Sequence, residues 1–415
     1  MDFPANSCIN SGDMRKFSTA IFSLTLFASS SFGVFATELQ TKSAPETDTK
    51  LIPLPVYATS PTEGGTYGFM PVFMEIEKDG PTRHIVAPSI TWNDTIHVTG
   101  TFRWYYYPAK DESFTLIAGS SSHVNNGMML QYTNKPLKDY QWTMDAYMRL
   151  QRSIFFRFFG IGPETDQGNE SSNTRSRLDT YFREGYNFNR YFNVGLKVQL
   201  QRDVLERDPI PPLPLTEDKF ATTPGAGGAS VVSEGVSVRF DTRENGQYSQ
   251  RGLGSEFFAA TAQGLNNSGN FDKIEWDTRI LFKELSWIDG AARVYWAYKL
   301  GENIPFYYQS ALGGSLLLRG FDEDRFVDKG AWELEFEQRI KMFSTHIYNV
   351  TTDWRVDPFV TMGQVYGGAN MFFKNPQLAA GLGFRAYVHP NVVGRVDIAE
   401  GGEGLKFYVE LGYPF

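Results

Sequence analysis

One arginine is better placed to do chemistry than any other residue of this chain. Arg319 stands between the apolar run 316–318 and the acidic cluster 322–324, and Gly320 follows it directly. A guanidinium on a glycine-containing turn could bind a phosphate, could be an ordinary surface charge, or could pair with carboxylates inside a larger structure. The surrounding elements must decide between these possibilities.

Three carboxylates at alternate positions follow this arginine. Glu333, Glu335 and Glu337 are separated by the apolar residues Leu334 and Phe336. In an extended chain this spacing places all three carboxylates on one face, where they repel each other. A cation among them would relieve that repulsion, and the planar fork of an arginine can bridge two carboxylates.

The composition indicates a membrane barrel more than a soluble protein. The 415 residues include 34 Phe, 21 Tyr, 8 Trp and 39 Gly, yet 21% are charged. A barrel in a membrane can have both, because alternate residues face lipid and water. The net charge of −8 argues against a nucleic-acid partner. Beyond residue 36 no apolar run is long enough for a helical span.

Alternation of apolar and polar residues continues along most of the chain and predicts strands. A soluble sandwich would also alternate, but its strands are usually shorter. Because bacterial barrels have an even number of strands, we expect an all-β, antiparallel transmembrane barrel of about sixteen strands, with one of the seventeen candidates merged or outside the membrane. The candidates are 65–76, 83–93, 95–107, 113–122, 126–134, 139–150, 177–188, 191–202, 234–243, 253–263, 271–284, 290–300, 330–341, 357–366, 377–388, 391–399 and 404–415.

The first 63 residues are predicted to lie outside the barrel. A basic, then apolar, then small-residue order from Met14 to Ala36 is typical of a cleaved signal peptide, with Met14 as the true start; a membrane anchor is the alternative. The single cysteine, Cys8, precedes this segment. Residues 37–63 are expected to be a periplasmic linker and residues 64–415 the barrel. Export to the outer membrane of a Gram-negative bacterium follows from this organisation.

The end of the chain has the pattern of a terminal barrel strand. Apolar residues occupy every second position at Phe407, Val409, Leu411, Tyr413 and Phe415. Aromatic girdles at the membrane boundary account for such residues. A buried terminal strand of a soluble protein is the alternative.

Several segments resemble the bacterial surface antigen family, the BamA-like outer-membrane barrels. The resemblance rests on 313–321, Gly330, Glu337-Gln338-Arg339, and the segments 158–165, 238–252 and 383–399, and it extends over 65–415. It implies a sixteen-stranded barrel in which the loop ending in Arg319-Gly320-Phe321 folds into the lumen and pairs with Glu337. Thr361 stands where the family has a second acidic partner, so Glu335 and Glu333 are expected to substitute for it.

The resemblance also shapes the functional prediction. Residues 37–63 are too few for a periplasmic POTRA domain, which predicts a barrel-only member. No G-x-S-x-G pentapeptide occurs and the five histidines are scattered, so we expect no enzyme activity, no cofactor and no metal site.

The resemblance implies a role in envelope biogenesis or in polypeptide or lipid transport. The expected partners are outer-membrane lipids, the barrel-assembly machinery and an unidentified polypeptide or lipid substrate. A passive channel and a module acting through its outer loops remain alternatives.

Overall fold

The computed structural model describes residues 47–78, 81–109, 111–135, 141–243, 249–347, 350–368, 372–388 and 392–415. The predicted signal peptide lies outside the described residues. Among those that are described, no helix is long and apolar enough to cross a membrane.

The described chain is built almost entirely of strands. The wall strands are β1 Thr47–Ser60, β2 Gly64–Glu77, β3 Thr82–Val86, β4 Ser89–Asn93, β5 His97–Ala109, β6 Glu112–Ser121, β7 Asn126–Asn134, β8 Trp142–Phe158, β9 Ser171–Asn187, β10 Phe192–Glu206, β11 Ala229–Asp241, β12 Gly252–Asn266, β13 Phe271–Lys283, β14 Ile288–Gly301, β17 Gly330–Ile347, β18 Val350–Tyr366, β19 Gln377–Val388, β20 Val392–Glu400 and β21 Leu405–Leu411. The loops contain η1 Gln167–Asn169, α2 Thr216–Lys219, η3 Phe306–Tyr308, β15 Ser310–Leu312 and β16 Phe326–Asp328.

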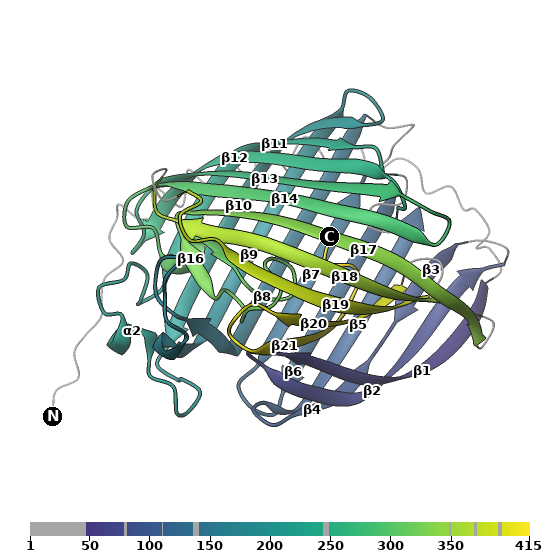
Figure 1. Cartoon of the computed structure of the whole chain (residues 1–415), viewed down its shortest axis with the longest axis horizontal. Helices are drawn as coiled ribbons and strands as arrows, with labels where there is room; N and C mark the ends of the chain where they lie inside the picture. Colours follow the sequence, from purple (N-terminus) through teal and green to yellow (C-terminus); the bar gives the residue numbers. More distant parts are fainter. Residues whose placement is uncertain are drawn as a thin grey trace, which may run out of the picture.

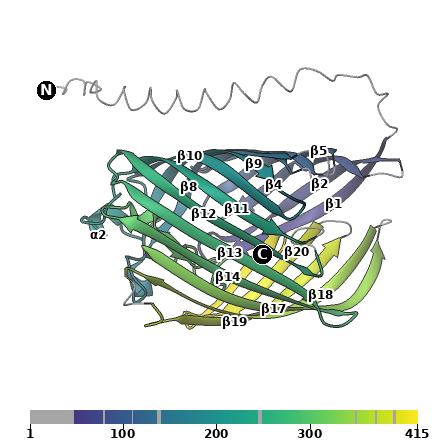
Figure 2. The same ribbon diagram turned by 90° about the horizontal axis from the view of Figure 1, so that it is seen from above.

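All wall strands belong to one antiparallel sheet that curves into a barrel (Figures 1 and 2). Each strand pairs with its neighbour in sequence, and β14 pairs with β17 across the long loop that contains β15 and β16. β3 and β4 both lie between β2 and β5. The nineteen strands of the sheet therefore occupy eighteen positions in the described chain.

The two ends of the sheet meet at β1 and β21. These strands lie side by side, with Cα atoms within 8 Å of each other. Between their described residues, however, no hydrogen-bonded ladder connects them, whereas β1 is paired with β2 along its whole length. We call this junction the seam.

The predicted fold class is confirmed, but two predictions about its N-terminal part are wrong. The first is the expectation that one of the seventeen candidate segments is merged or lies outside the wall, because all seventeen overlap wall strands. The even number comes instead from an added strand, β1, which occupies 47–60 of the predicted linker. Pro53 and Pro55 obscure its alternation, because proline is typical of linkers and rare inside sheets.

The wall is inverted relative to a soluble protein. On β17, Leu334 and Phe336 are about 40% exposed, whereas Glu333, Glu335 and Glu337 on the opposite face are buried. Large exposed apolar side chains follow the same outward face on other strands, as at Trp276 of β13 and Phe384 of β19. Outward apolar and inward charged residues are the pattern that a bilayer requires of a barrel.

The two ends of the barrel differ in their connections. At one end the turns are short, as at 188–191 and 284–287, and at the other end the connections 159–170, 207–228 and 302–329 are long. The long connections pack together: the Phe158 and Phe306 rings lie 4.0 Å apart between centroids and share a cluster with Leu205 and Val327. This packing covers the long-loop end of the lumen.

The last residues of the chain do not continue the terminal strand. Phe407 faces outward as predicted and is 44% exposed, but β21 ends at Leu411. Gly412, with φ of +89°, turns the chain so that Tyr413 and Phe415 are buried. Phe415 packs with inward-facing side chains of β13 and β14, so the predicted alternation fails for these two aromatics.

Candidate lumen-loop site

The loop between β14 and β17 is brought into the lumen by its glycines and its apolar residues. Gly313, Gly314 and Gly320 have φ between +108° and +123°, a region that residues with a Cβ rarely adopt. Leu312, Leu318, Phe321 and Phe326 then form an apolar cluster with small wall residues, namely Ala331, Val365 and Ala379. This cluster fixes the loop tip, Arg319-Gly320-Phe321, against the inner wall.

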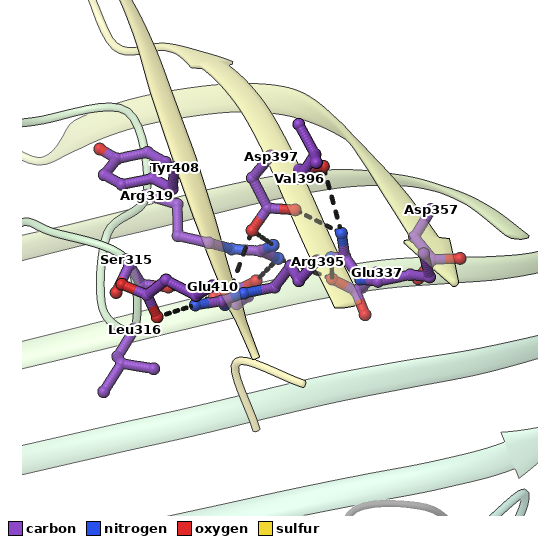
Figure 3. A network of polar contacts seen from close by, with 12 residues as sticks. Ser315, Leu316, Arg319, Glu337, Asp357, Arg395, Val396, Asp397, Tyr408 and Glu410 are labelled. Carbon is purple, nitrogen blue, oxygen red and sulfur yellow. Dashed lines mark hydrogen bonds and ion pairs between the residues drawn. The ribbon is translucent and has the colours of Figure 1, made fainter. Parts of the chain in front are cut away.

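Arg319 is completely buried and binds carboxylates from two different parts of the wall (Figure 3). Its Nη1 donates to Asp397 Oδ2 at 2.9 Å and its Nη2 to Glu337 Oε2 at 2.8 Å. Nη2 also donates to Glu335. The guanidinium carbon lies 3.5 Å from the centroid of the Phe359 ring, so a cation–π contact covers one face of the group.

Of the three predicted partners, the structure brings Glu335 and Glu337 to Arg319 but gives Glu333 other partners. Glu333 Oε1 accepts hydrogen bonds from the Leu318 backbone N–H at 2.5 Å and from Thr361 Oγ1 at 2.8 Å. Thr361 thus binds a wall glutamate and not the arginine. A further acidic partner, which the family resemblance places at this position and which this chain lacks there, is supplied by Asp397 on β20.

Further arginines from the wall complete the network. Arg385 Nη1 donates to Asp397 at 2.5 Å, and its Nε lies 3.2 Å from Asp357. Arg339 Nε donates to Glu337 at 2.9 Å. A buried carboxylate is tolerated only when cations and hydrogen bonds compensate its desolvation, and these arginines provide that compensation.

Gly320 is held by a tyrosine on the last strand. Its N–H donates to the Tyr408 hydroxyl oxygen at 3.1 Å, and this hydroxyl donates to the Phe321 carbonyl at 2.6 Å. A Cβ built on Gly320 would lie 2.7 Å from the Ala379 Cβ. The tip therefore requires glycine for both its φ of +123° and the close approach of β19.

Contacts on both sides of the tip fix the rest of the loop. Arg293 and Arg395 donate to the Leu316 and Ser315 carbonyls at 2.9 and 3.0 Å. On the other side, Lys406 Nζ donates to Asp322 at 2.8 Å.

Arg325 links the loop to two further connections. Its Nε donates to Glu403 in the β20–β21 turn at 2.9 Å, and its Nη1 donates to Thr165 in the β8–β9 connection at 2.8 Å. The loop is thus held by ion pairs and hydrogen bonds along its length.

Two neighbouring acidic side chains of the same loop have raised pKa values. Desolvation of the carboxyl group, followed by the neighbouring carboxylates of Asp324, Glu410 and Glu63, raises the pKa of Glu323 to about 8, although the side chain as a whole is exposed. Burial also raises the pKa of Asp324, against the opposing effect of Arg175 and Arg177. The loop therefore carries one carboxyl group, that of Glu323, whose charge changes near neutral pH.

Sequence reasoning missed Asp397, Phe359 and Tyr408. All three face inward on strands whose register relative to the loop is set only by the closed sheet. The one available signal was the alternation on β20, in which the inward residues Arg395 and Asp397 alternate with Val396 and Ile398. Among the described residues no group of three His, Cys, Asp or Glu side chains could hold a metal ion.

The family assignment rests on the sequence match and agrees with this geometry. Residues 110–387 match the Omp85 superfamily domain. The chain belongs to the Omp85 superfamily. This membership supports an outer-membrane location. No curated protein sequence matches the chain.

Two solved structures resemble this Omp85 member in fold. BamA from Haemophilus ducreyi lacking POTRA domains 1–3 has a TM-score of 0.53 at 12% identity, with 86% of this chain and 74% of that chain covered. CdiB from Escherichia coli also has a TM-score of 0.53, at 10% identity, with 89% of this chain covered. The present chain spans 63% of the length of that CdiB chain. At these identities the likeness shows the barrel fold alone.

Proposed function

We propose that this Omp85 barrel moves a polypeptide or a lipid-linked substrate into or across the outer membrane, as a component of envelope biogenesis. The observation that carries the proposal is the seam, where the barrel wall lacks a ladder between neighbouring strands. A wall that can part there gives a substrate a route between lumen and membrane. The family and the two barrel neighbours support biogenesis or transport in general.

The sequence of β1 explains why the seam stays unpaired. Pro53 of β1 lies opposite Pro71 of β2. Neither proline has an N–H to donate, so the two form a non-hydrogen-bonded pair of the β1–β2 ladder, with their backbone groups directed away from each other. Every second residue of β1 is in the same situation, so the backbone groups of residues 51, 53, 55 and 57 are directed towards the seam. Two of these four residues are prolines, which leaves only two N–H donors on this side of β1.

A disulfide staple across the seam tests the proposal. Cysteine pairs are placed between 56–58 of β1 and 407–409 of β21, and the pair that oxidises in the membrane is used. The control staple joins Tyr57→Cys to Tyr67→Cys, which are partners in the existing β1–β2 ladder. Both stapled proteins are returned to a deletion strain whose outer-membrane proteins and lipids are quantified.

We expect the deletion to deplete at least one envelope component. The unmodified protein and the control staple should restore that component, and the seam staple should restore it only after reduction. Full restoration by the oxidised seam staple would overturn the proposal. A steady conductance of the unmodified protein in planar bilayers, unchanged by the staple, would favour the passive channel instead.

A further inference from the structure

A cavity of about 680 Å³ lies at the seam and is lined from both faces of the wall. From the lumen side it is lined by Met70, Ser89 and Arg103, and from the outer side by the exposed aromatics Trp354 and Phe384. Residues of β1 and β21 lie between these two groups. The cavity therefore connects the lumen to the lipid-facing surface.

The charges that line this cavity are mostly positive. Among the described residues that line it are four arginines and one carboxylate, that of Glu410. Three of the arginines have carboxylate partners at 3.3 Å or less: Arg355 binds Asp289, Arg385 binds Asp397 and Arg395 binds Glu410.

Arg103 differs from the other three. Its Nη1 donates to Ser89 Oγ at 2.9 Å and lies 3.8 Å from Met70 Sδ. No described carboxylate lies within ion-pair distance of it. Its side chain thus contacts β4 and β2, the strands that separate β5 from β1 and the seam. A partly buried guanidinium with neutral neighbours favours an anion as an additional partner.

The two chemistries of the cavity together select one kind of ligand. The Arg103 side favours a phosphate, and the Trp354 and Phe384 side favours hydrocarbon. A free phosphate would leave the apolar part unused, and a neutral lipid would leave the arginine without a counter-charge. We propose that the seam cavity binds an anionic phospholipid, with its phosphate at Arg103 and its acyl chains against the outer surface of β18 and β19.

This site does not depend on the transport function proposed above, since a barrel that only conducts ions could also hold such a lipid. The first test is native mass spectrometry of the purified full chain equilibrated with phosphatidylglycerol or phosphatidylcholine of identical acyl chains. Both lipids carry a phosphate that Arg103 could bind, but phosphatidylcholine also carries a quaternary ammonium, which neutralises the headgroup and repels the guanidinium. We therefore expect roughly a tenfold preference for the net-anionic phosphatidylglycerol. Arg103→Gln should abolish it.

The matched control is Arg149→Gln, because Arg149 also faces the lumen, on β8, but does not line the cavity. It should retain the preference. Folding of each variant is checked by the electrophoretic shift on heating. If Arg103→Gln does not fold, Arg103→Lys is used in its place; it keeps the charge and should retain part of the preference.

A second measurement needs no variant at Arg103. Phosphatidylglycerol with brominated acyl chains should quench tryptophan fluorescence more than brominated phosphatidylcholine, and Trp354→Phe should remove the difference. Equal retention of both lipids by the unmodified protein would overturn the proposal. Loss of the preference in Arg149→Gln would also overturn it. The same holds if inorganic phosphate or an acidic peptide competes with the bound lipid as strongly as added phosphatidylglycerol does.

Discussion

Arg319 at the loop tip and Asp397 on β20 are 78 residues apart in sequence, yet their guanidinium and carboxylate meet at 2.9 Å with both side chains completely buried. This pair connects the loop to the penultimate strand of the barrel. Arg395 on the same strand binds both the loop, at Ser315, and Glu410 on β21. The position of the loop is thus coupled to the strand that forms one side of the seam.

Removing the arginine should release the loop. Loss of one partner from a buried ion pair costs about 3–5 kcal/mol, so Arg319→Ala should lower the free energy of unfolding by about this amount. We also expect a higher conductance in planar bilayers, because the loop no longer fills the lumen. Arg207→Ala, which breaks an exposed ion pair with Asp218, is the control and should cost less than about 1 kcal/mol. Equal behaviour of the two variants would show that the loop is not held by Arg319.

Gly320→Ala separates steric contact from backbone strain. Gly402 also has a positive φ, +93°, but a Cβ there would meet nothing within 4 Å. Gly402→Ala should therefore cost only the backbone strain, about 1–3 kcal/mol. Gly320→Ala should cost more and raise conductance as well, because its Cβ also meets β19. Thermal unfolding measures the stability of the two variants, and bilayer recordings measure their conductance. If Gly320→Ala is no less stable than Gly402→Ala, Gly320 does not lie as close to β19 as the structure indicates.

Thr361→Asp tests whether the acidic residue expected at this position would fit. The Thr361 hydroxyl donates to Glu333, so an aspartate would remove a donor and place a second carboxylate beside the first. We expect a loss of about 1–3 kcal/mol, the cost of an unsatisfied buried group, whereas Thr361→Ser should be nearly neutral. A Thr361→Asp protein that unfolds at the same denaturant concentration as the unmodified one would mean that Arg319 can reach the new carboxylate.

The sequence was sufficient to predict every wall position except that of β1, and to single out Arg319, for definite physical reasons. Outward residues such as Leu334 must be apolar and inward ones such as Glu337 need not be, so alternation marks each strand locally. The contact with Asp397 could not be predicted in this way, because it depends on the register of strands far along the chain.

Two terminal features were missed because the alternation in the sequence does not follow the backbone there. Proline at 53 and 55 weakens the strand pattern of β1, although these positions need no donor for the β1–β2 ladder. Tyr413 and Phe415 keep the alternation of β21 in sequence, but Gly412 turns them into the lumen. In both places the backbone, and not the apolar pattern, determines the structure.

The loop should be held less tightly as the pH rises. The pKa of Glu323 is raised to about 8 in the folded loop, whereas a released loop would have the ordinary value near 4.5. The stabilisation is therefore fully present below pH 4.5 and is lost as the pH rises through about 8. Conductance recorded between pH 5 and pH 9 should increase with pH. Glu323→Gln should flatten this dependence, and an unchanged profile would show that other groups cause it.

Restoring the missing donors should close the seam. Pro53 and Pro55 of β1 point their backbone towards β21, so threonine at both positions supplies two N–H groups where the sheet lacks them. Each hydrogen bond formed with β21 contributes about 0.5–1.5 kcal/mol, and we expect a more stable barrel. Hydrogen exchange should slow in 51–57 and in 405–411.

Pro71→Thr is the control, because the backbone groups of Pro71 are directed away from β1. This variant should leave hydrogen exchange at the seam unchanged. Since substrate passage is proposed to require a wall that parts, the double threonine variant should also restore the deletion strain less well than the unmodified protein. A double variant with unaltered exchange would mean that the geometry of β21, and not the prolines of β1, keeps the seam open.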